Sequence, residues 1–274
     1  LLLEEMNSLT EYHLEGAEEY RRIFPGWKKA KRIEDLPFLH VGLFKNLELR
    51  TKMNGTKHER IVCSSSTSGG SPSKMVLDQR SSRLYAKSIK KILADFIGEK
   101  KRPLLVLDCA KSLYGRSVMS ARIAAAMRLN QFSTQTYFLL EDPDNVESIQ
   151  YKLLSEILSK NDDFIVYGFS WVLWLSWAAR GLPCEISGLL KGKKITFVHS
   201  GGWKKLEAIK VDRSKFNDCL LQNLALSSTV VDFYGLVEQL GVIYPLCEYG
   251  ARHVPVWADI IVRNIYSHKP LKSE

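Results

Sequence analysis

The sequence lacks a long apolar run, a paired cysteine motif and an extended arm of one charge. Its longest apolar run, residues 164–179, has 16 residues. A helix needs roughly 20 apolar residues to cross a bilayer, so we predict no membrane span. The five cysteines form an odd set without a C-x-x-C spacing, and no secretory leader precedes them. Reduced thiols in the cytoplasm are therefore expected.

Positive charge exceeds negative charge but is spread along the chain. The formal net charge is +9, and the basic residues form short groups between acidic residues, at 28–32, 90–91, 100–102, 191–194 and 204–205. These groups are either a solvated surface or a face for a polyanionic nucleotide or an acidic carrier protein. No DNA- or RNA-binding signature accompanies the charge, so we predict no nucleic-acid partner.

The composition is that of a globular protein, with 45% apolar and 25% charged residues in a chain of 274. Disordered and collagen-like classes are excluded on this basis. Residues 1–60 read as an N-terminal segment of helices and loops. The chain opens on Leu1 rather than Met and stops shortly after a strand-like run at 254–263, so we expect a fragment of a longer protein.

From residue 61 onward, short apolar runs alternate with amphipathic stretches. Helices are predicted from the stripe that begins at Leu84 and ends at Gly98, over 118–129, and from a cap at Asp144 to about Ser159. Strands are predicted at 61–62, 104–107, 137–140, 164–167, 195–198 and 230–234. This alternation predicts an α/β fold with a mostly parallel sheet covered by helices. It forms a nucleotide-binding domain over 61–274, or the whole chain is one continuous domain. Ligands collect at the carboxyl ends of such strands.

A loop of small hydroxyl residues and glycines follows the first predicted strand. It spans 63–74 and ends in Lys74, with these candidate residues between: Ser65, Ser66, Thr67, Ser68, Gly69 and Gly70. Small residues let backbone N–H groups approach phosphate oxygens, hydroxyls add donors, and lysine adds positive charge. The alternative is a flexible Ser/Gly linker. The spacing excludes a Walker loop.

Two further glycine motifs follow predicted strands. Ser200-Gly201-Gly202 follows the strand at 195–198. The strand at 230–234 ends in Tyr234, with Gly235 next and Glu238 three residues further on. A carboxylate is a suitable hard oxygen ligand for magnesium. The alternative for the second motif is an ordinary strand end and turn.

In this order, the three motifs resemble the signatures of the adenylate-forming superfamily. The resemblance implies that the loop around Thr67, Ser68 and Lys74 holds the triphosphate and that the glycine turn after Ser200 lies against adenine. It also implies that Tyr234 stacks on adenine and that Glu238 holds magnesium. The fold would be the large N-terminal domain of such an enzyme, without its C-terminal domain.

Within the superfamily the sequence is most similar to the acyl-protein synthetases of bacterial bioluminescence, and next to phenylacetate-CoA ligases. The first family implies a ligase that activates a fatty acid with ATP and magnesium and transfers the acyl group to a protein thiol. A carrier protein or CoA are further candidate acceptors. Alternatives are an aryl- or acyl-CoA ligase, a non-catalytic nucleotide-binding domain, and an α/β hydrolase in which Ser170 follows a strand. Val172 stands where the hydrolase motif requires glycine.

Other residue groups have two interpretations each. Cys247 and His253 carry zinc-ligand side chains and form a possible zinc half-site, or they are a buried thiol and a surface imidazole. His199 contacts a ligand or is structural. Three tryptophans recur at helical spacing: Trp171, Trp174 and Trp177. They belong to the core or form a wall of the acyl pocket.

Overall fold

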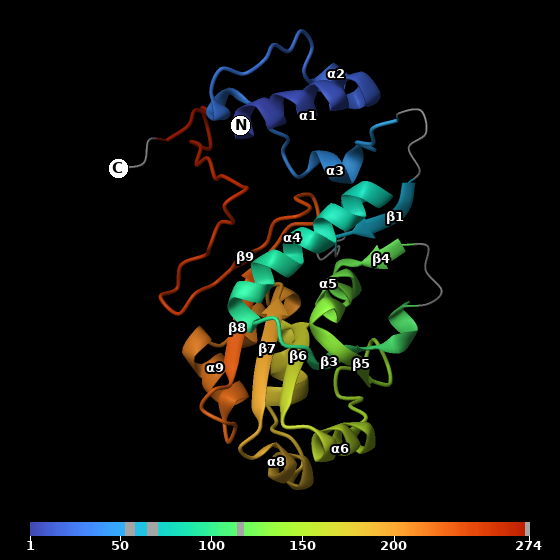
Figure 1. Ribbon diagram of the computed structural model, residues 1–274, viewed down its shortest axis with the longest axis vertical. Coiled ribbons are helices and arrows are strands. Elements are labelled where there is room, and N and C mark those ends of the chain that lie inside the picture. The colour runs from blue at the N-terminus through green and yellow to red at the C-terminus, as the bar shows by residue number, and fades with distance from the viewer. Residues whose placement is uncertain (53–57, 65–70, 114–117, 272–274) are drawn as a thin grey trace.

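The computed structural model describes residues 1–52, 58–64, 71–113 and 118–271. The molecule is elongated, with the N-terminal helices at one end and the larger sheet toward the other (Figure 1). The N-terminal elements are α1 (Leu2–Gly16), α2 (Glu18–Ile23), a 3-10 turn (Ile33–Asp35) and α3 (Leu43–Asn46). Helices and loops make up the described chain up to residue 52, and the first strand begins at His58; the predicted boundary near residue 60 stays a prediction.

The larger sheet has six strands in the order β5-β3-β6-β7-β8-β9. Every neighbouring pair is parallel except β8 and β9. This arrangement confirms the predicted fold class, a mostly parallel sheet with helices. The bounds are β3 (Arg102–Cys109), β5 (Ser133–Leu140), β6 (Asp163–Phe169), β7 (Lys194–Ser200), β8 (Thr229–Tyr234) and β9 (Tyr244–Pro245).

The central strands are mostly apolar, as expected where helices cover both sides of a parallel sheet. In β6 and β7, all residues after the first are buried. The covering helices are α4 (Gln79–Ile97), α5 (Ala121–Leu129), α6 (Tyr151–Lys160), α8 (Cys184–Leu190) and α9 (Arg213–Leu221). Helix α4 ends at Gly98, where φ is +74°, as the sequence predicts. Between β6 and α8 lie α7 (Ser170–Leu173) and a π-helical turn (Trp174–Ala178).

A smaller sheet of three strands lies between the N-terminal helices and the larger sheet (Figure 1). Its strands are β1 (His58–Cys63), β2 (Lys74–Asp78) and β4 (Val118–Ser120). Strand β1 is antiparallel to β2 and parallel to β4. Short 3-10 turns complete the described elements, at Ala110–Leu113, Asn130–Phe132 and Lys204–Ile209.

Three predicted elements are wrong. Asp144 does not cap a helix: its N–H donates to Asp142 Oδ1 at 2.9 Å in a turn, and α6 begins only at Tyr151. Residues 118–120 form a strand because they pair with β1, so the helix begins at Ala121. The run at 254–263 is not a strand in the described chain, where its backbone makes only an isolated bridge, between Arg263 and Pro270.

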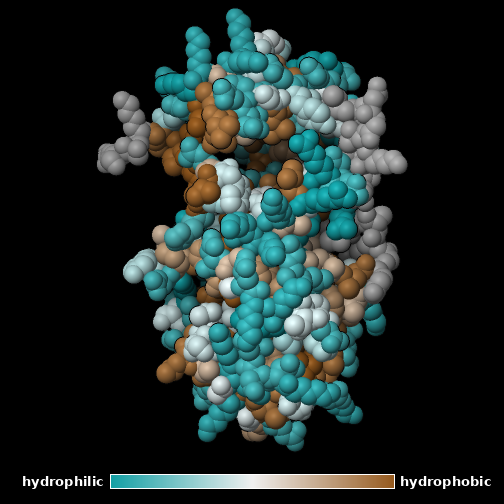
Figure 2. Space-filling view, viewed as in Figure 1, coloured by the Kyte–Doolittle hydropathy of each residue, from teal (hydrophilic) through white to brown (hydrophobic). Residues whose placement is uncertain are grey.

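The segment 254–271 instead exposes many of its apolar side chains. Val256 is 98% exposed, Val262 61% and Ile265 75%. Figure 2 shows apolar side chains gathered on the side of the molecule where this segment runs in Figure 1. Trp174 and Trp177 are buried in the core, which confirms the core interpretation for these two residues. None of the described helices combines the length and hydrophobicity of a membrane-spanning helix.

Candidate functional site

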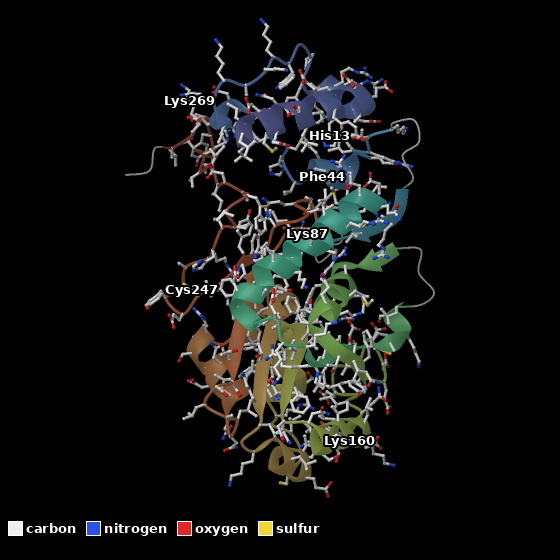
Figure 3. All side chains as sticks on the ribbon, in the orientation of Figure 1. His13, Phe44, Lys87, Lys160, Cys247 and Lys269 are labelled. Carbon is white, nitrogen blue, oxygen red and sulfur yellow. The ribbon has the colours of Figure 1, made fainter. Side chains whose placement is uncertain are left out.

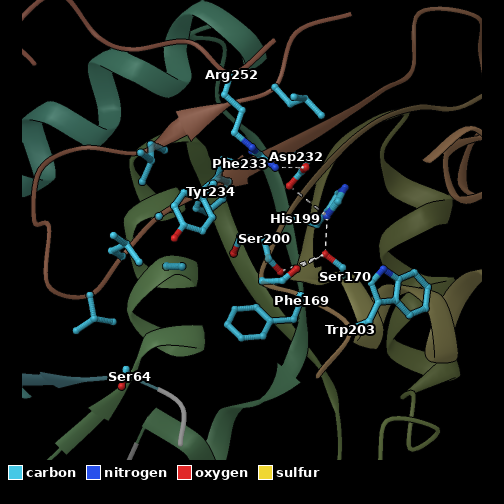
Figure 4. Close-up of a pocket in the computed structure, with 18 of the residues that line it drawn as sticks. Ser64, Phe169, Ser170, His199, Ser200, Trp203, Asp232, Phe233, Tyr234 and Arg252 are labelled. Atoms are coloured by element: carbon cyan, nitrogen blue, oxygen red, sulfur yellow. Dashed lines mark hydrogen bonds and ion pairs between the residues drawn. The ribbon is translucent and has the colours of Figure 1, made fainter. Parts of the chain in front are cut away.

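A cavity of about 880 Å³ opens at the carboxyl ends of β6, β7 and β8 (Figure 4). Each of these strands ends in the cavity wall, with Phe169, Ser200 and Tyr234 respectively. The register pairs Phe169 with Ser200 and Ser200 with Phe233, so the three strand ends are adjacent. The N-terminal segment also reaches the cavity, through residues such as Lys45. A parallel sheet places its ligand site at this edge.

Two of the three predicted motifs meet in this cavity. The turn after β7 contributes Ser200, Gly201 and Gly202, and the turn after β8 contributes Tyr234, Gly235 and Glu238, all of which line the wall. Their roles in binding stay predictions.

Both turns have a glycine where a side chain would be strained or crowded. Gly201 has a φ of +79°, and a Cβ there would lie 3.3 Å from the ring of Phe169. At Gly235 a Cβ would lie 3.1 Å from Ile243 Cγ2. Glycine therefore lets both turns pack closely around the cavity.

The third motif lies mostly outside the described residues, which leave out Ser65, Ser66, Thr67, Ser68, Gly69 and Gly70. The two described ends of the motif are joined by hydrogen bonds. The N–H of Ser64 donates to the carbonyl of Ser73 at 3.0 Å, and the N–H of Ser73 donates to Ser64 Oγ at 2.9 Å. Ser64 lines the cavity. Lys74 is exposed on β2, opposite Cys63, and is not among the described residues of the cavity wall.

A network of polar side chains crosses the cavity wall. Ser170 Oγ lies 2.9 Å from His199 Nδ1, which lies 3.9 Å from Asp232 Oδ1. Arg252 donates to Asp232 Oδ2 at 2.7 Å and to the carbonyl of Tyr244 at 2.9 Å (Figure 4). Sequence reasoning missed Asp232 and Arg252. Asp232 could have been found from its place two residues before Tyr234, but nothing in the sequence marks Arg252.

His199 is neutral at physiological pH. Burial lowers the pKa of its imidazole from 6.5 to about 4, with Asp232 opposing this change and Arg252 and Arg213 reinforcing it. Protonation would place a positive charge on a ring that is shielded from water, which is unfavourable.

Aromatic rings form one side of the cavity. Trp203 and Phe216 line it, with ring centroids 6.0 Å apart. Phe216 also lies 4.9 Å from the ring of His199 and stacks on the buried Trp174 at 6.1 Å. These contacts form a packed aromatic wall.

Cys247 and His253 lie together outside the cavity wall. A hydrogen bond from His253 lowers the pKa of the Cys247 thiol. Figure 3 shows Cys247 at the edge of the molecule, away from the helix that carries His13. The described residues hold no group of three or more His, Cys, Asp or Glu side chains that could bind a metal ion. The predicted zinc half-site therefore has two ligands in the described chain.

The two glycines of the β7 turn provide a matched pair for mutation. We expect Gly201→Ala to destabilise the fold by about 1–2 kcal/mol, because a side chain at this positive φ is strained. A Cβ at Gly202 meets no atom within 4 Å and its φ is not in the left-handed region, so Gly202→Ala should change stability little. Urea unfolding without ligand measures both, and equal effects would contradict this account of the turn.

The mainly parallel sheet and the cavity at its carboxyl edge define an α/β protein with a cavity at the strand ends. The family of acyl-protein synthetases, LuxE, matches residues 5–272. The chain belongs to this family, which is a family of ligases. The match confirms the family that the motifs indicate.

A comparison with solved structures matches ATP-bound MatB from Rhodopseudomonas palustris, with 14% identity and a TM-score of 0.47. A chimera described as ATP-bound RpMatB-BxBclM has 12% identity and a TM-score of 0.45. Each match covers 82% of this chain and 39% of the length of the solved chain. The N-terminal subdomain of NpsA from Klebsiella oxytoca, in complex with 3-hydroxybenzoyl-AMSN, has 14% identity and a TM-score of 0.43. The match covers 81% of this chain and 52% of the NpsA chain. A search of curated protein sequences found no match.

Proposed function

We propose that this chain binds ATP in the cavity and activates a carboxylic acid as an acyl adenylate. The acid's carboxylate would attack the α-phosphate, and the bond to the β-phosphate would break to release pyrophosphate. The observation that carries this proposal is the meeting of two glycine turns, after Ser200 and after Tyr234, in one cavity at adjacent strand ends. Membership of the acyl-protein synthetase family supports acyl activation in general.

The nucleotide would bind between these two turns. Tyr234 is 48% exposed and presents an aromatic face for adenine. Arg252 supports that ring from a distance of 5.9 Å, and Gly201 and Gly202 let the backbone approach the ligand. The loop with Thr67 and Ser68, followed by Lys74, would hold the triphosphate. Catalysis would then rest on positioning and on electrostatic stabilisation of an in-line displacement.

The donor chemistry of Glu238 fits magnesium. Its side chain lines the cavity and has no hydrogen bond or ion pair with any other described residue. Magnesium in nucleotide sites is held by one or two carboxylates together with substrate phosphates. When bound, the ion would neutralise charge on the phosphates. Glu238 would hold it in place beside the triphosphate.

The acid would lie against the aromatic wall formed by Phe169, Trp203 and Phe216. This apolar surface supports a fatty acid, and an aromatic acid is the alternative. We further propose a protein thiol as the acyl acceptor, with a carrier protein or CoA as alternatives, and the cytoplasm as the location. The cavity wall carries four basic residues and two acidic ones, which favours anionic ligands; they are Lys45, Lys210, Arg213, Arg252, Asp232 and Glu238.

Trapping the intermediate tests this function and identifies the acid. The chain is incubated with ATP, magnesium, hydroxylamine and one acid from a panel of fatty and aromatic acids. An acyl hydroxamate that forms only with ATP and a particular acid would establish activation and its substrate class. ATP binding without any hydroxamate would instead favour the non-catalytic nucleotide-binding domain.

The two-ligand site at Cys247 and His253 has a separate test. A stable structural zinc site uses four ligands, and the described chain offers Cys247 and His253. We therefore expect the purified chain to contain well under one zinc ion per molecule by metal analysis. One zinc per chain, lost on Cys247→Ser but retained in the matched cysteine variant Cys184→Ser, would contradict this expectation and establish a complete site.

A further inference from the structure

Two buried polar side chains in the cavity wall, Ser170 and His199, have no role in the function proposed above. Ser170 follows β6 directly and is 5% exposed, and His199 lies on β7 and is 7% exposed. The strand register pairs Gly168 with His199 and so brings the two side chains together. Buried polar groups are retained where their hydrogen bonds are satisfied.

Ser170, His199 and Asp232 resemble a hydrolase triad but lack its geometry. In a triad, serine and carboxylate contact opposite nitrogens of the imidazole. Here the Ser170 and Asp232 oxygens lie 2.9 Å and 3.9 Å from the same atom, His199 Nδ1. Asp232 instead accepts a hydrogen bond from Arg252 at 2.7 Å. The geometry therefore argues against the hydrolase alternative.

The hydrogen-bond partners of Ser170 determine where the protons lie. Ser170 Oγ is 2.7 Å from the carbonyl of Gly201 and 3.3 Å from that of Ser200. A carbonyl only accepts, and a hydroxyl has one proton, so this proton is donated to Gly201, the nearer carbonyl. His199 Nδ1 must then donate to the Ser170 oxygen. Neutral His199 is therefore the tautomer with its proton on Nδ1.

We propose that Ser170 is a positioning residue for the nucleotide, and that His199 directs its hydroxyl. The hydroxyl fixes the carbonyl of Gly201, a residue at φ +79° with the Phe169 ring directly beside it. The Gly201-Gly202 turn is thus held in one orientation before ligand binds. This inference rests on the proposed function, because that function assigns the turn to the nucleotide.

Kinetics of acid-dependent pyrophosphate exchange test the role of Ser170. Ser170→Ala should raise the KM for ATP about 10-fold, the effect of losing one buried hydrogen bond, and leave the KM for the acid within about twofold. The matched control is Ser176→Ala. Ser176 is also buried and also donates to a carbonyl, that of Val172 at 2.6 Å, but it does not line the described cavity. Equal effects of the two variants on the KM for ATP would overturn the proposal.

Two substitutions of His199 separate its ring nitrogens. An asparagine amide reaches the position of Nδ1 and retains the donor to Ser170, whereas a glutamine amide reaches that of Nε2. His199→Asn should therefore raise the KM for ATP less than His199→Gln does. The reverse order would overturn the assignment of the donor.

A spectroscopic measurement on substrate-free protein keeps this test independent of activity. With isotope-labelled histidine, nuclear magnetic resonance should show the His199 ring proton on Nδ1, in a signal that His199→Asn removes. A proton on Nε2 would overturn the proposal. If no acid supports exchange in the wild-type chain, the proposed function fails, while the tautomer still tests the Ser170–His199 arrangement.

Discussion

Replacing Glu238 by Gln should lower acid-dependent pyrophosphate exchange about 100-fold, the scale of losses when a group that stabilises transition-state charge is removed. Glutamine keeps the size of the side chain but removes the negative charge that would hold magnesium beside the phosphates. The apparent KM for magnesium should rise together with the loss of rate. Both are measured by varying magnesium at fixed ATP.

A matched control separates this local effect from a change in net charge. Glu248 is exposed and lies outside the described cavity wall, so Glu248→Gln makes the same chemical change away from the site. We expect its exchange rate to equal that of the wild type. Unchanged exchange and unchanged magnesium dependence in Glu238→Gln would remove Glu238 from the proposed site.

Protein stability should fall by about 3 kcal/mol as the pH is lowered from about 6.5 to about 4, through His199 alone. Its pKa is about 4 in the folded protein and 6.5 when exposed. The unfolded chain therefore binds the proton first as the pH falls, and each protonation favours unfolding. Well above pH 6.5 both states are neutral at this site, and the contribution no longer changes.

The comparison with His199→Asn isolates this contribution. Carboxylates titrate in the same range, and burial also lowers the pKa of His13, but these groups are common to both proteins. The stability difference between wild type and His199→Asn, from urea unfolding, should change by about 3 kcal/mol between pH 7 and pH 4. Exposed His268 supplies the control, His268→Asn. A difference independent of pH would contradict the buried, neutral state of His199.

The strands of the larger sheet could be predicted because local and tertiary signals agree there. Buried parallel strands need apolar side chains on both faces, so 164–167 and 195–198 read as short apolar runs. Asp144 misled the prediction because aspartate caps turns as readily as helices. The side chains of Asp142 and Asn145 accept hydrogen bonds from backbone N–H groups two residues further on, within a turn. The helix starts after this turn.

The site was predictable only where it follows strand ends. Ser200 and Tyr234 each end a strand of one parallel sheet, so the order of the motifs was sufficient to bring them together. Arg252 reaches Asp232 only because the chain returns along β9, which pairs with β8, and because Arg252 donates a hydrogen bond to the carbonyl of Tyr244. The Ser170–His199 contact depends on the register of β6 and β7. Long-range pairing of this kind leaves no periodic signal in the sequence.

The central claim is that this chain forms an acyl adenylate from ATP, and exchange of labelled pyrophosphate into ATP tests it most directly. The reaction is run with a panel of fatty and aromatic acids on this chain and on a longer form that extends beyond residue 274. We predict exchange that depends on one class of acid and is lost in Glu238→Gln. Bound ATP with no exchange for any acid, in either form, would contradict adenylation.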